Sequence, residues 1–370
     1  MKVAIIHYWL INYRGGEKVI EALLEMFPDA DIFTHVYDPA SMPQSINSHK
    51  IYTSYINKFP FAKKLYQKYM PFMPKALSEF NLQDYDLIIS SESGPAKGVI
   101  PNPDAFHICY CHSPMRYLWD MYHEYFNNTG FLSKFFMKKL IPGLRQWDIS
   151  SSNLVDAFIA NSNYVSKRIK RYYNRDCHIV FPPVDIEKFI NTERKHPSSK
   201  VDEYYLFFGQ LTGYKRADLA IEACIASGRK LVVAGSGMKN KDLKKYAKNG
   251  IISFTGKISD EKIIELYAGA KALLFPGIED FGIVPVEANA TGCPVIAYRK
   301  GGALDSIKEG VTGLFFDKQN VSSLVKAMDE FEAIEDSFQN RSVYNAHVEQ
   351  FSRESFKEKI NSIIADKRQI

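Results

Sequence analysis

Short apolar runs alternate along the chain with segments in which apolar residues recur every three or four positions. The runs are rich in Val, Ile and Phe and have the length of strands, whereas the spacing between them is that of helices with one buried face. Such alternation predicts parallel sheets with crossover helices. The predicted strands of the first half are KVAIIHY, DADIFTHV, DLIISS, FHICYCH, DAFIANS and HIVFPP, and those of the second half are YYLFFGQL, KLVVAG, ISFTGK, KALLFPG, CPVIAY and GLFF.

A polar, proline-containing segment, NTERKHPSSKVDE at residues 191–203, lies between the two groups of strands and is predicted to be a linker or a domain-edge loop. The fold class is therefore α/β, with two Rossmann-like, doubly wound domains at residues 1–185 and 186–349. A last helical pattern, at residues 350–370, is predicted to cross back onto the first domain. Ligands of such sheets bind at the carboxyl ends of the strands, so we expect the site in a cleft between two facing domains.

The composition is that of an ordinary globular protein, with 46% hydrophobic and 24% charged residues among 370. The chain contains no apolar run of about 18 residues, which argues against a transmembrane helix, and its first residues lack the pattern of a secretory leader. Five cysteines are scattered along the chain, and an odd, scattered set predicts reduced thiols and a cytoplasmic location. They are Cys109, Cys111, Cys177, Cys224 and Cys293.

The net charge is only +5, but its distribution is uneven: residues 39–78 contain six lysines and seven aromatic residues and no acid. One interpretation is a solvated helical face over an aromatic-rich core. The other is a surface that meets anionic lipid headgroups, because interleaved lysine and aromatic residues suit an interfacial segment. Nucleic acid is a weaker candidate, since the rest of the chain is not basic enough to follow a phosphate backbone.

Two loops at predicted strand ends have features of phosphate sites. Gly15-Gly16-Glu17 precedes a predicted helix, where glycines allow close backbone approach and the helix N-terminus favours an anion. A structural turn explains these glycines equally well. The loop FGQLTGYKR at residues 208–216 ends in Lys215 and Arg216, which could clamp a diphosphate or form a solvated pair at a helix start.

The segment GIEDFGIVPVEANA at residues 277–290 carries a stronger signal. Its helix is predicted to begin near Ile283, with Pro285 in the first turn, so that the backbone N–H groups of Phe281, Gly282, Ile283 and Val284 face an anion. Glu279 and Glu287 would lie about 12 Å apart if the interval were helical, too far to share a proton. They would then serve different parts of one elongated ligand. Capping of the helix start would explain Asp280 or Glu279 but not Glu287.

No metal site is predicted. Asp29-Ala30-Asp31 and Asp84-Tyr85-Asp86 have the spacing of metal-dependent transferases, but each stands just before an apolar strand, where acids commonly mark turns. Cys109 and Cys111 lie beside His112, yet alternation along a strand places both thiols on one face, where burial as small hydrophobic side chains is the better interpretation.

Taken together, these motifs resemble the retaining glycosyltransferases of family four, which have the GT-B fold. The resemblance covers almost the whole chain and is closest to the WbaZ-type mannosyltransferases of bacterial surface polysaccharide assembly. The residues that carry it are Gly-Gly-Glu at 15–17, CHSPMRYLWD at 111–120, DAFIANSNYVSKRI at 156–169, VFPPVD at 180–185, the loop with Tyr-Lys-Arg at 214–216, FTGK at 254–257, and the two glutamates of EDFGIVPVE at 279–287.

The resemblance implies roles for individual residues. Glu279 would contact the transferred sugar and Glu287 the ribose hydroxyls of a sugar nucleotide. Lys215 would bind the diphosphate, and His112 would approach the donor sugar. Gln210 stands where the family usually has arginine, so Lys215, Arg216 and the loop with the glycines at 15 and 16 would bind more of the negative charge of the diphosphate. Base choice would depend on backbone contacts at residues 254–258, which include Lys257 and Ile258.

The implied reaction is a metal-independent, retaining hexosyl transfer, in which the acceptor attacks on the face that the diphosphate leaves. The expected donor is GDP-mannose as substrate, with no cofactor, and the expected acceptor is a lipid-linked saccharide of lipopolysaccharide or O-antigen assembly. A cytoplasmic protein bound peripherally to the inner membrane surface is expected, without nucleic acid. The alternatives are a UDP-sugar donor, a nucleotide-sugar epimerase of the same architecture, and a non-catalytic sugar-nucleotide-binding protein.

Overall fold

The computed structural model describes residues 1–127, 129–194, 203–237 and 243–367, and these divide into two compact units. The N-terminal unit comprises residues 1–182 and the chain from 357 onward, and the C-terminal unit comprises residues 183–356. The predicted boundary lies after residue 185. Residues 195–202 of the predicted linker lie outside the described residues, as do the last three of the predicted final helix.

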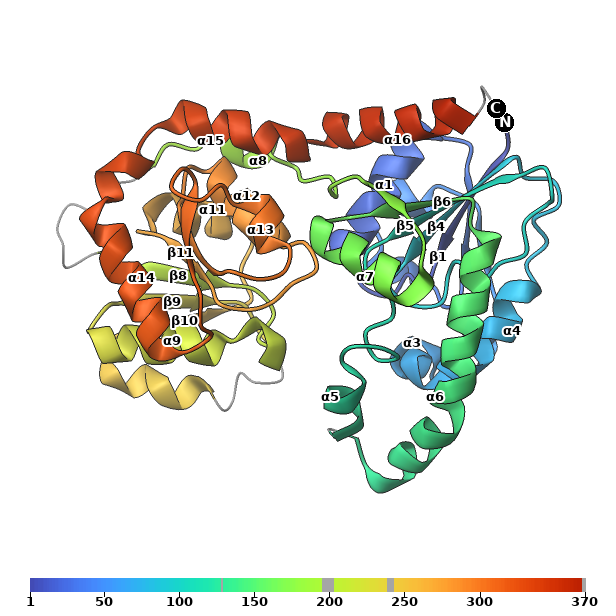
Figure 1. Cartoon of the computed structure of the whole chain (residues 1–370), viewed down its shortest axis with the longest axis horizontal. Coiled ribbons are helices and arrows are strands. Elements are labelled where there is room, and N and C mark those ends of the chain that lie inside the picture. The colour runs from blue at the N-terminus through green and yellow to red at the C-terminus, as the bar shows by residue number, and fades with distance from the viewer. Residues whose placement is uncertain (128, 195–202, 238–242, 368–370) are drawn as a thin grey trace. The chain divides into compact units, whose positions relative to one another are not determined.

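The N-terminal unit is a seven-stranded parallel sheet in the order β3-β2-β1-β4-β5-β6-β7 (Figure 1). Its strands are β1 Val3–His7, β2 Asp31–Thr34, β3 Ile51–Thr53, β4 Leu87–Glu92, β5 Phe106–Cys111, β6 Ala157–Ala160 and β7 Cys177–Ile179. Its helices are α1 Gly15–Met26, α2 Gln44–Asn47, α3 Ala62–Leu65, α4 Met73–Ser78, α5 Tyr122–Asn127, α6 Phe131–Ser151 and α7 Asn163–Tyr173, with short 3₁₀ turns η1 Pro39–Ser41, η2 Tyr55–Lys58, η3 Tyr66–Phe72 and η4 Ser152–Leu154.

The C-terminal unit is a six-stranded parallel sheet in the order β10-β9-β8-β11-β12-β13. Its strands are β8 Tyr205–Phe208, β9 Leu231–Ala234, β10 Ile252–Gly256, β11 Leu273–Phe275, β12 Val295–Tyr298 and β13 Gly313–Phe316. Its helices are α8 Glu187–Ile190, α9 Ala217–Ser227, α11 Asp260–Gly269, α12 Ile283–Ala290, α13 Ala303–Ser306, α14 Val321–Ala333 and α15 Arg341–Val348, with 3₁₀ turns η6 Gly213–Lys215, η7 Lys244–Asn249, η8 Glu335–Phe338 and η9 Glu349–Phe351. Helix α16, Arg353–Lys367, begins in this unit and ends in the other.

All twelve predicted strands are present, and the α/β class with two Rossmann-like units is confirmed. Most strands are buried apolar runs; β1, for example, is buried at all five of its residues, whereas the edge strands β3 and β7 are half-buried or exposed. Cys109 and Cys111 lie in one apolar cluster with Phe158, as their alternation predicts. Among the described residues, no helix combines the length and the apolarity needed to cross a bilayer.

The lysine-rich segment at residues 39–78 forms short helices and the edge strand β3 rather than one helical face. Part of its aromatic set packs as a core: Phe59, Tyr66 and Tyr69 lie against buried Ile56 and Met73. Phe61 and Phe72 instead remain exposed, so the segment has both a core side and an apolar surface.

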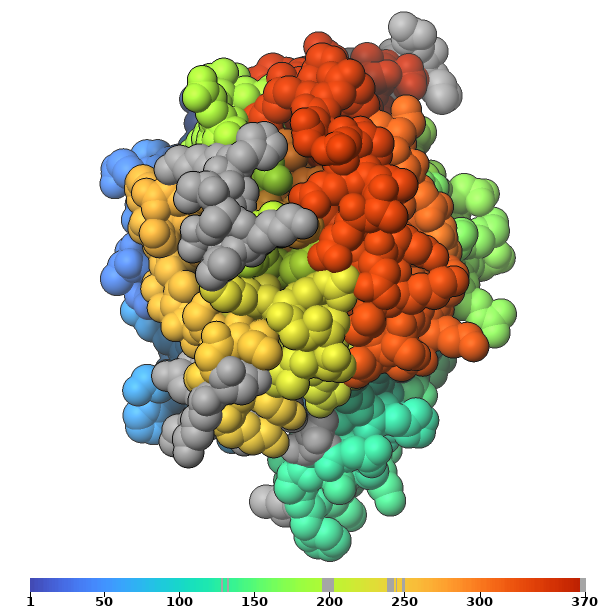
Figure 2. Space-filling view, turned by 90° about the vertical axis from the view of Figure 1, so that its left-hand side faces the viewer, coloured from blue at the N-terminus to red at the C-terminus, as the bar shows by residue number. Residues whose placement is uncertain are grey.

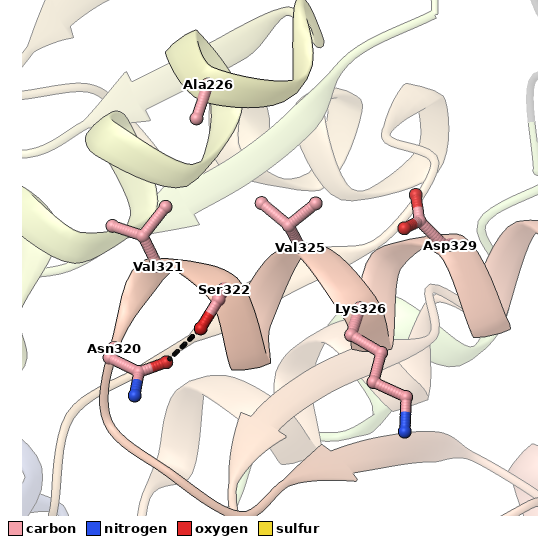
Figure 3. Close-up of a pocket in the computed structure, with 7 residues that line it drawn as sticks. All are labelled: Ala226, Asn320, Val321, Ser322, Val325, Lys326 and Asp329. Atoms are coloured by element: carbon pink, nitrogen blue, oxygen red, sulfur yellow. Dashed lines mark hydrogen bonds between the residues drawn. The ribbon is translucent and has the colours of Figure 1, made fainter.

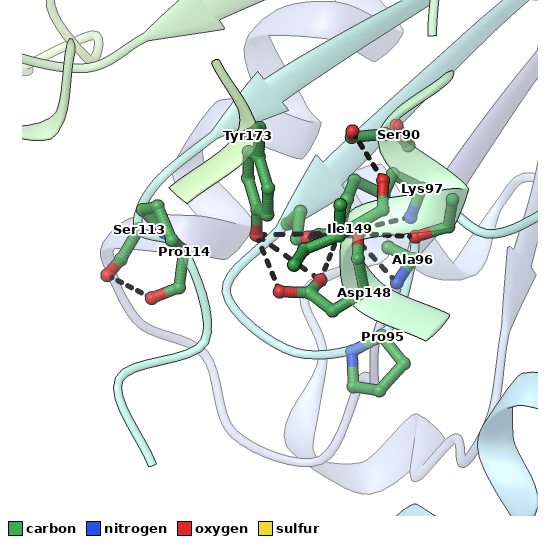
Figure 4. Close-up of polar contacts among 12 residues, drawn as sticks. Ser90, Pro95, Ala96, Lys97, Ser113, Pro114, Asp148, Ile149 and Tyr173 are labelled. Carbon is green, nitrogen blue, oxygen red and sulfur yellow. Dashed lines mark hydrogen bonds and ion pairs between the residues drawn. The ribbon is translucent and has the colours of Figure 1, made fainter. Parts of the chain in front are cut away.

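A fully buried charge cluster ties three parts of the N-terminal unit together (Figure 4). The ammonium of Lys97 lies 2.8 Å from a Glu92 oxygen and also pairs with Asp148 of α6. Tyr173 of α7 and the Trp119 indole donate hydrogen bonds to Asp148. The strand end of β4 is thereby fixed to α6 and α7.

Candidate active site

In the C-terminal unit, the loops after β8 and β11 meet at the point where the strand order reverses. Strands β9 and β10 lie on one side of β8, and β11 lies on the other. Doubly wound sheets bind ligands at this switch point. The loop after β8 supplies Lys215 and the loop after β11 supplies Glu279, and Lys215 Nζ lies 2.8 Å from Glu279 Oε1. The structure therefore brings two predicted site residues into direct contact.

This pair is largely shielded from water, with side-chain exposures of 14% for Lys215 and 18% for Glu279. Burial by itself lowers the pKa of Lys215, but Glu279, Tyr214 and Glu287 outweigh it and hold that pKa above its ordinary value. The lysine is therefore a fixed positive charge at the switch point. A fixed charge in a poorly solvated place interacts strongly with an anionic ligand.

Two buried oxygens in the same loops lack a well-aligned hydrogen bond within the described residues: Thr212 Oγ1 and Glu279 Oε1. The 2.8 Å contact of Glu279 with Lys215 is thus an ion pair of short distance without hydrogen-bond alignment. Buried polar atoms in proteins are nearly always hydrogen-bonded. The buried Thr212 hydroxyl oxygen therefore points to a polar ligand, and the Lys215 ammonium of the same loop favours one with an anionic group.

Close backbone contacts fix the loop that carries Glu279. Gly302 donates its N–H to the Glu279 carbonyl at 2.9 Å, and a Cβ on Gly302 would lie 2.2 Å from Phe281 Cα. Gly282 has a φ of 92°, which favours glycine, and is the N-cap of α12. Gly302 was not among the predicted site residues, although Gly301 and Gly302 follow a predicted strand just as Gly15 and Gly16 do.

Helix α12 begins at Ile283 with Pro285 in its first turn, as predicted. Glu287 is half-buried on this helix, and the Tyr267 hydroxyl donates to its Oε2 at 3.4 Å. Burial, followed by the nearby Glu287 charge, raises the pKa of Tyr267 well above its ordinary value, so the hydroxyl remains a donor. The Phe281 ring packs against the Phe351 ring, with their centroids 5.6 Å apart.

The other predicted donor residues of this unit differ in their surroundings. Gln210 and Lys257 are exposed, and Ile258 is half-buried after the edge strand β10. Asp280 and Val284 are half-buried beside the Glu279 loop. Arg216 pairs with Asp218 of α9, its Nε 3.0 Å from Oδ2, so it is engaged within its own helix start.

In the N-terminal unit, His112 and Gly16 come together at the corresponding switch point, between β1 and β4. His112 follows β5, and its Nε2 lies 2.8 Å from the Ser91 Oγ of β4. A Cβ on Gly16 would lie 3.9 Å from the same Nε2 and 3.0 Å from the Tyr8 hydroxyl. Glycine at 16 therefore allows α1 to approach the histidine.

Gly15 and Gly16 form the first turn of α1, whereas the sequence pattern predicts a turn before the helix. The helix begins earlier than predicted because Glu17 Oε2 accepts the Arg14 N–H at 2.8 Å, which caps the first turn at Gly15. This capping contact compensates for the poor helix propensity of glycine.

Comparison with known proteins assigns both units. The Glycosyltransferase Family 4 model matches residues 13–188, and the Glycosyl transferases group 1 model matches residues 188–348. The chain belongs to the GT-B glycosyltransferases.

The individual relatives of this glycosyltransferase are distant. An uncharacterized glycosyltransferase of Methanocaldococcus jannaschii is 31% identical over 156 residues, 39% of each chain. The GDP-mannose-dependent alpha-mannosyltransferase of Corynebacterium glutamicum is 26% identical over 210 residues, 55% of this chain and 50% of that one. The matches thus span half or less of these relatives. The structure of Anabaena HepE with UDP-glucose has a TM-score of 0.69 at 15% identity, covers 99% of this chain and 100% of that one, and shows a common fold.

A separate hollow of the glycosyltransferase lies between α9 and α14, which are neighbours on the face seen in Figure 2 (Figures 2 and 3). Val321 and Val325 point toward Ala226 across it, and Asp329 pairs with Arg229. The hollow is an apolar helix seam without convergent polar groups, so it does not suit a nucleotide. Over the described ranges, no group of three His, Cys, Asp or Glu residues is placed to hold a metal ion.

Proposed function

We propose that this glycosyltransferase moves a hexose, mannose from GDP-mannose, with retention of configuration onto a lipid-linked saccharide of surface polysaccharide assembly, as in the WbaZ-type enzymes. The observation that carries the proposal is the Lys215–Glu279 pair at the switch point of the C-terminal sheet, in the same loops as the buried Thr212 hydroxyl, which has no hydrogen-bond partner within the described residues. A sugar diphosphate has both the anion that Lys215 would bind and the hydroxyls that Glu279 and Thr212 would engage.

In this mechanism the chain supplies charge and position rather than a nucleophile. Lys215 and the first N–H groups of α12 stabilise the negative charge that grows on the departing diphosphate. Glu279 accepts hydrogen bonds from the transferred sugar and Glu287 from the ribose, and His112 is assigned to the sugar by the family resemblance. The positive charge that the leaving group needs is thus provided by residues of the chain, and we propose that the reaction needs neither a metal nor a cofactor.

The proposal also specifies the base of the donor nucleotide. The C. glutamicum match is named for GDP-mannose, which favours a guanosine-linked donor. HepE is described with UDP-glucose, which keeps a UDP-sugar as the second candidate. Both candidates use the same Lys215 and Glu279 chemistry and differ in the base and in the sugar.

Titration calorimetry with GDP and with UDP in the presence of EDTA separates these donors. We expect GDP to bind and UDP to bind at least tenfold more weakly. Glu287→Ala should weaken GDP binding by about 10- to 100-fold, since a charged hydrogen bond to ribose contributes about 1.5–3 kcal/mol. Glu279→Ala should abolish transfer with a smaller loss of GDP affinity.

Stronger binding of UDP would keep the site and reject mannose. Equal losses of GDP affinity in the two variants would reject the division of roles between the glutamates. Loss of binding in EDTA, restored by a divalent cation, would reject the metal-free mechanism.

Peripheral membrane contact is proposed from exposed aromatic residues near lysines. At the start of α6, Phe131 is 89% exposed, and Phe135 and Phe136 are also exposed. No acid occurs from residue 131 to 147, whereas Lys138 and Lys139 are exposed there. Apolar side chains that enter the acyl boundary, flanked by lysines that meet anionic headgroups, are the chemistry of an interfacial helix.

Co-sedimentation with phosphatidylglycerol-containing vesicles tests this surface. The double variant Phe131→Ser/Phe135→Ser is expected to bind at least tenfold more weakly, because each ring that leaves water contributes about 1.5–3 kcal/mol. The matched control is Leu304→Ser/Ile334→Ser, which removes two exposed apolar side chains from the C-terminal unit. Equal binding by both double variants would show that α6 is not the membrane surface.

A further inference from the structure

A chain of four polar side chains leads from α1 to His112 inside the N-terminal unit. Glu17 Oε1 lies 3.5 Å from His7 Nε2. His7 Nδ1 lies 3.1 Å from Ser91 Oγ, and Ser91 Oγ lies 2.8 Å from His112 Nε2. His7, Glu17 and Ser91 are buried, and His112 at the end of the chain is half-buried.

The chemistry of the first member sets the direction of the hydrogen bonds. Glu17 accepts the Arg14 N–H through Oε2, and a carboxylate can only accept hydrogen bonds. His7 Nε2 lies 3.5 Å from this carboxylate without an aligned hydrogen bond within the described residues, and the negative charge favours the His7 tautomer that carries its proton on Nε2. In a neutral His7, Nδ1 is then an acceptor for the Ser91 hydroxyl. The Ser91 oxygen in turn accepts the N–H of His112 Nε2.

We propose that Glu17, His7 and Ser91 are positioning residues that hold neutral His112 in its Nε2-protonated tautomer. Nδ1 of His112 is then a hydrogen-bond acceptor, suited to a hydroxyl of the transferred sugar. This inference rests on the proposed function, in which His112 meets that sugar. It gives a positioning role to His7 and Ser91, which lie outside the predicted donor-binding motifs, and to Glu17 of the Gly-Gly-Glu motif, which had been assigned no contact.

Two further observations agree with a neutral, oriented ring. Burial, and next the neighbouring His7, lower the pKa of His112 to about 3, so the imidazole is uncharged near neutral pH and its tautomer matters. Gly16 lies against Tyr8, His7 and His112, where a larger residue would press on the Tyr8 hydroxyl. The same glycine therefore keeps α1, and with it Glu17, close to the histidines.

Strand β4 provides a matched control for Ser91. Ser90 is equally buried, and its Oγ lies 2.9 Å from Nε2 of another buried histidine, His107. Consecutive strand residues face opposite sides of the sheet, so Ser90 has the same kind of partner outside the proposed chain. Ser91→Ala and Ser90→Ala remove the same group from the same strand.

Nitrogen NMR of the full-length protein labelled with ¹⁵N-histidine reads the tautomer without any substrate. His112 is expected to be protonated at Nε2 in the wild type, with its signals assigned through His112→Gln. In Ser91→Ala the ring should become a mixture of tautomers, and Ser91→Thr should restore the wild-type form. Glu17→Gln should also give a mixture, because an amide can donate to His7 as well as accept. Ser90→Ala should leave His112 unchanged.

Steady-state release of GDP from GDP-mannose gives the second readout. Ser91→Ala is expected to lower kcat about tenfold, the effect of one orienting hydrogen bond, with the donor KM changed by less than about twofold. An Nδ1-protonated His112 in the wild type, or an unchanged tautomer in Ser91→Ala, would overturn the inference. Wild-type protein that neither binds nor turns over GDP or UDP donors would overturn the proposed function. The tautomer measurement would still show whether Glu17, His7 and Ser91 position His112.

Discussion

Lys215→Met is expected to lower kcat/KM for donor turnover by about 10²- to 10³-fold, the usual effect of removing a preorganised group that stabilises transition-state charge. The lysine is the fixed cation at the switch point, held charged by Glu279 and Glu287. Its loss removes the partner of the departing diphosphate and leaves the Glu279 carboxylate to repel the same anion. Methionine keeps the length and most of the volume of the side chain, so the loops after β8 and β11 keep their packing.

Lys271→Met is the matched control. Lys271 is also poorly exposed, at 12%, and pairs with Glu203 at 2.9 Å and Glu335 at 3.0 Å. It precedes β11 and so stands at the amino end of the sheet, away from the ligand edge. Release of nucleoside diphosphate and thermal unfolding should be measured for both variants. If Lys271→Met loses as much activity as Lys215→Met, the loss reports general damage to the unit rather than a diphosphate site.

The fold could be predicted from the sequence because its signal is local. A buried parallel strand needs a short run of Val, Ile and Phe, and each such run in this chain forms a strand. Strand β3 was missed because Ile51, Tyr52 and Thr53 form only a three-residue edge strand of half-buried side chains, without an apolar run. Edge strands carry the weakest pattern because one of their sides has no neighbour.

The candidate site could be predicted only as separate loops. Lys215 and Glu279 were each selected from their own loops, but their 2.8 Å contact depends on strand order, since β8 and β11 become neighbours only after β9 and β10 have been placed on the other side. Ser91 and His7 lie inside predicted strands, where a polar residue has no distinguishing pattern. Their function emerges only when β1 and β4 are paired at His7 and Ser91.

In both units the candidate site residues lie near the point where the strand order of the sheet reverses. In each sheet the first strand has its successors on one side and a later strand on the other. The strands at this reversal lead to Lys215 and Glu279 in one unit and carry His7 and Ser91 in the other, where Ser91 contacts His112 at the end of the next strand, β5. A reversal separates the loops that follow the two strands, which leaves room for a ligand at their carboxyl ends. The topology thus explains why residues distant in sequence converge.

Lys97→Met is expected to destabilise the N-terminal unit by about 3–5 kcal/mol, because removal of one partner from a buried charge cluster leaves the others uncompensated. Lys97 is fully buried and holds Glu92 and Asp148, which also anchor Trp119 and Tyr173. All three tryptophans of the chain, Trp9, Trp119 and Trp147, belong to this unit. Denaturant titration followed by tryptophan fluorescence therefore reports its unfolding selectively.

The control for this prediction is Lys63→Met, which breaks an exposed pair with Asp38 and should cost no more than about 1 kcal/mol. A second variant separates charge from packing: Asp148→Asn in the Lys97→Met background should recover part of the loss, because it removes one of the two uncompensated charges. Burial also raises the pKa of Glu92. A carboxyl group with a raised folded-state pKa opposes folding above that pKa, so the deficit of Lys97→Met should shrink as the pH falls. A deficit that is the same at all pH values and is not relieved by Asp148→Asn would show that Lys97 acts through its packing alone.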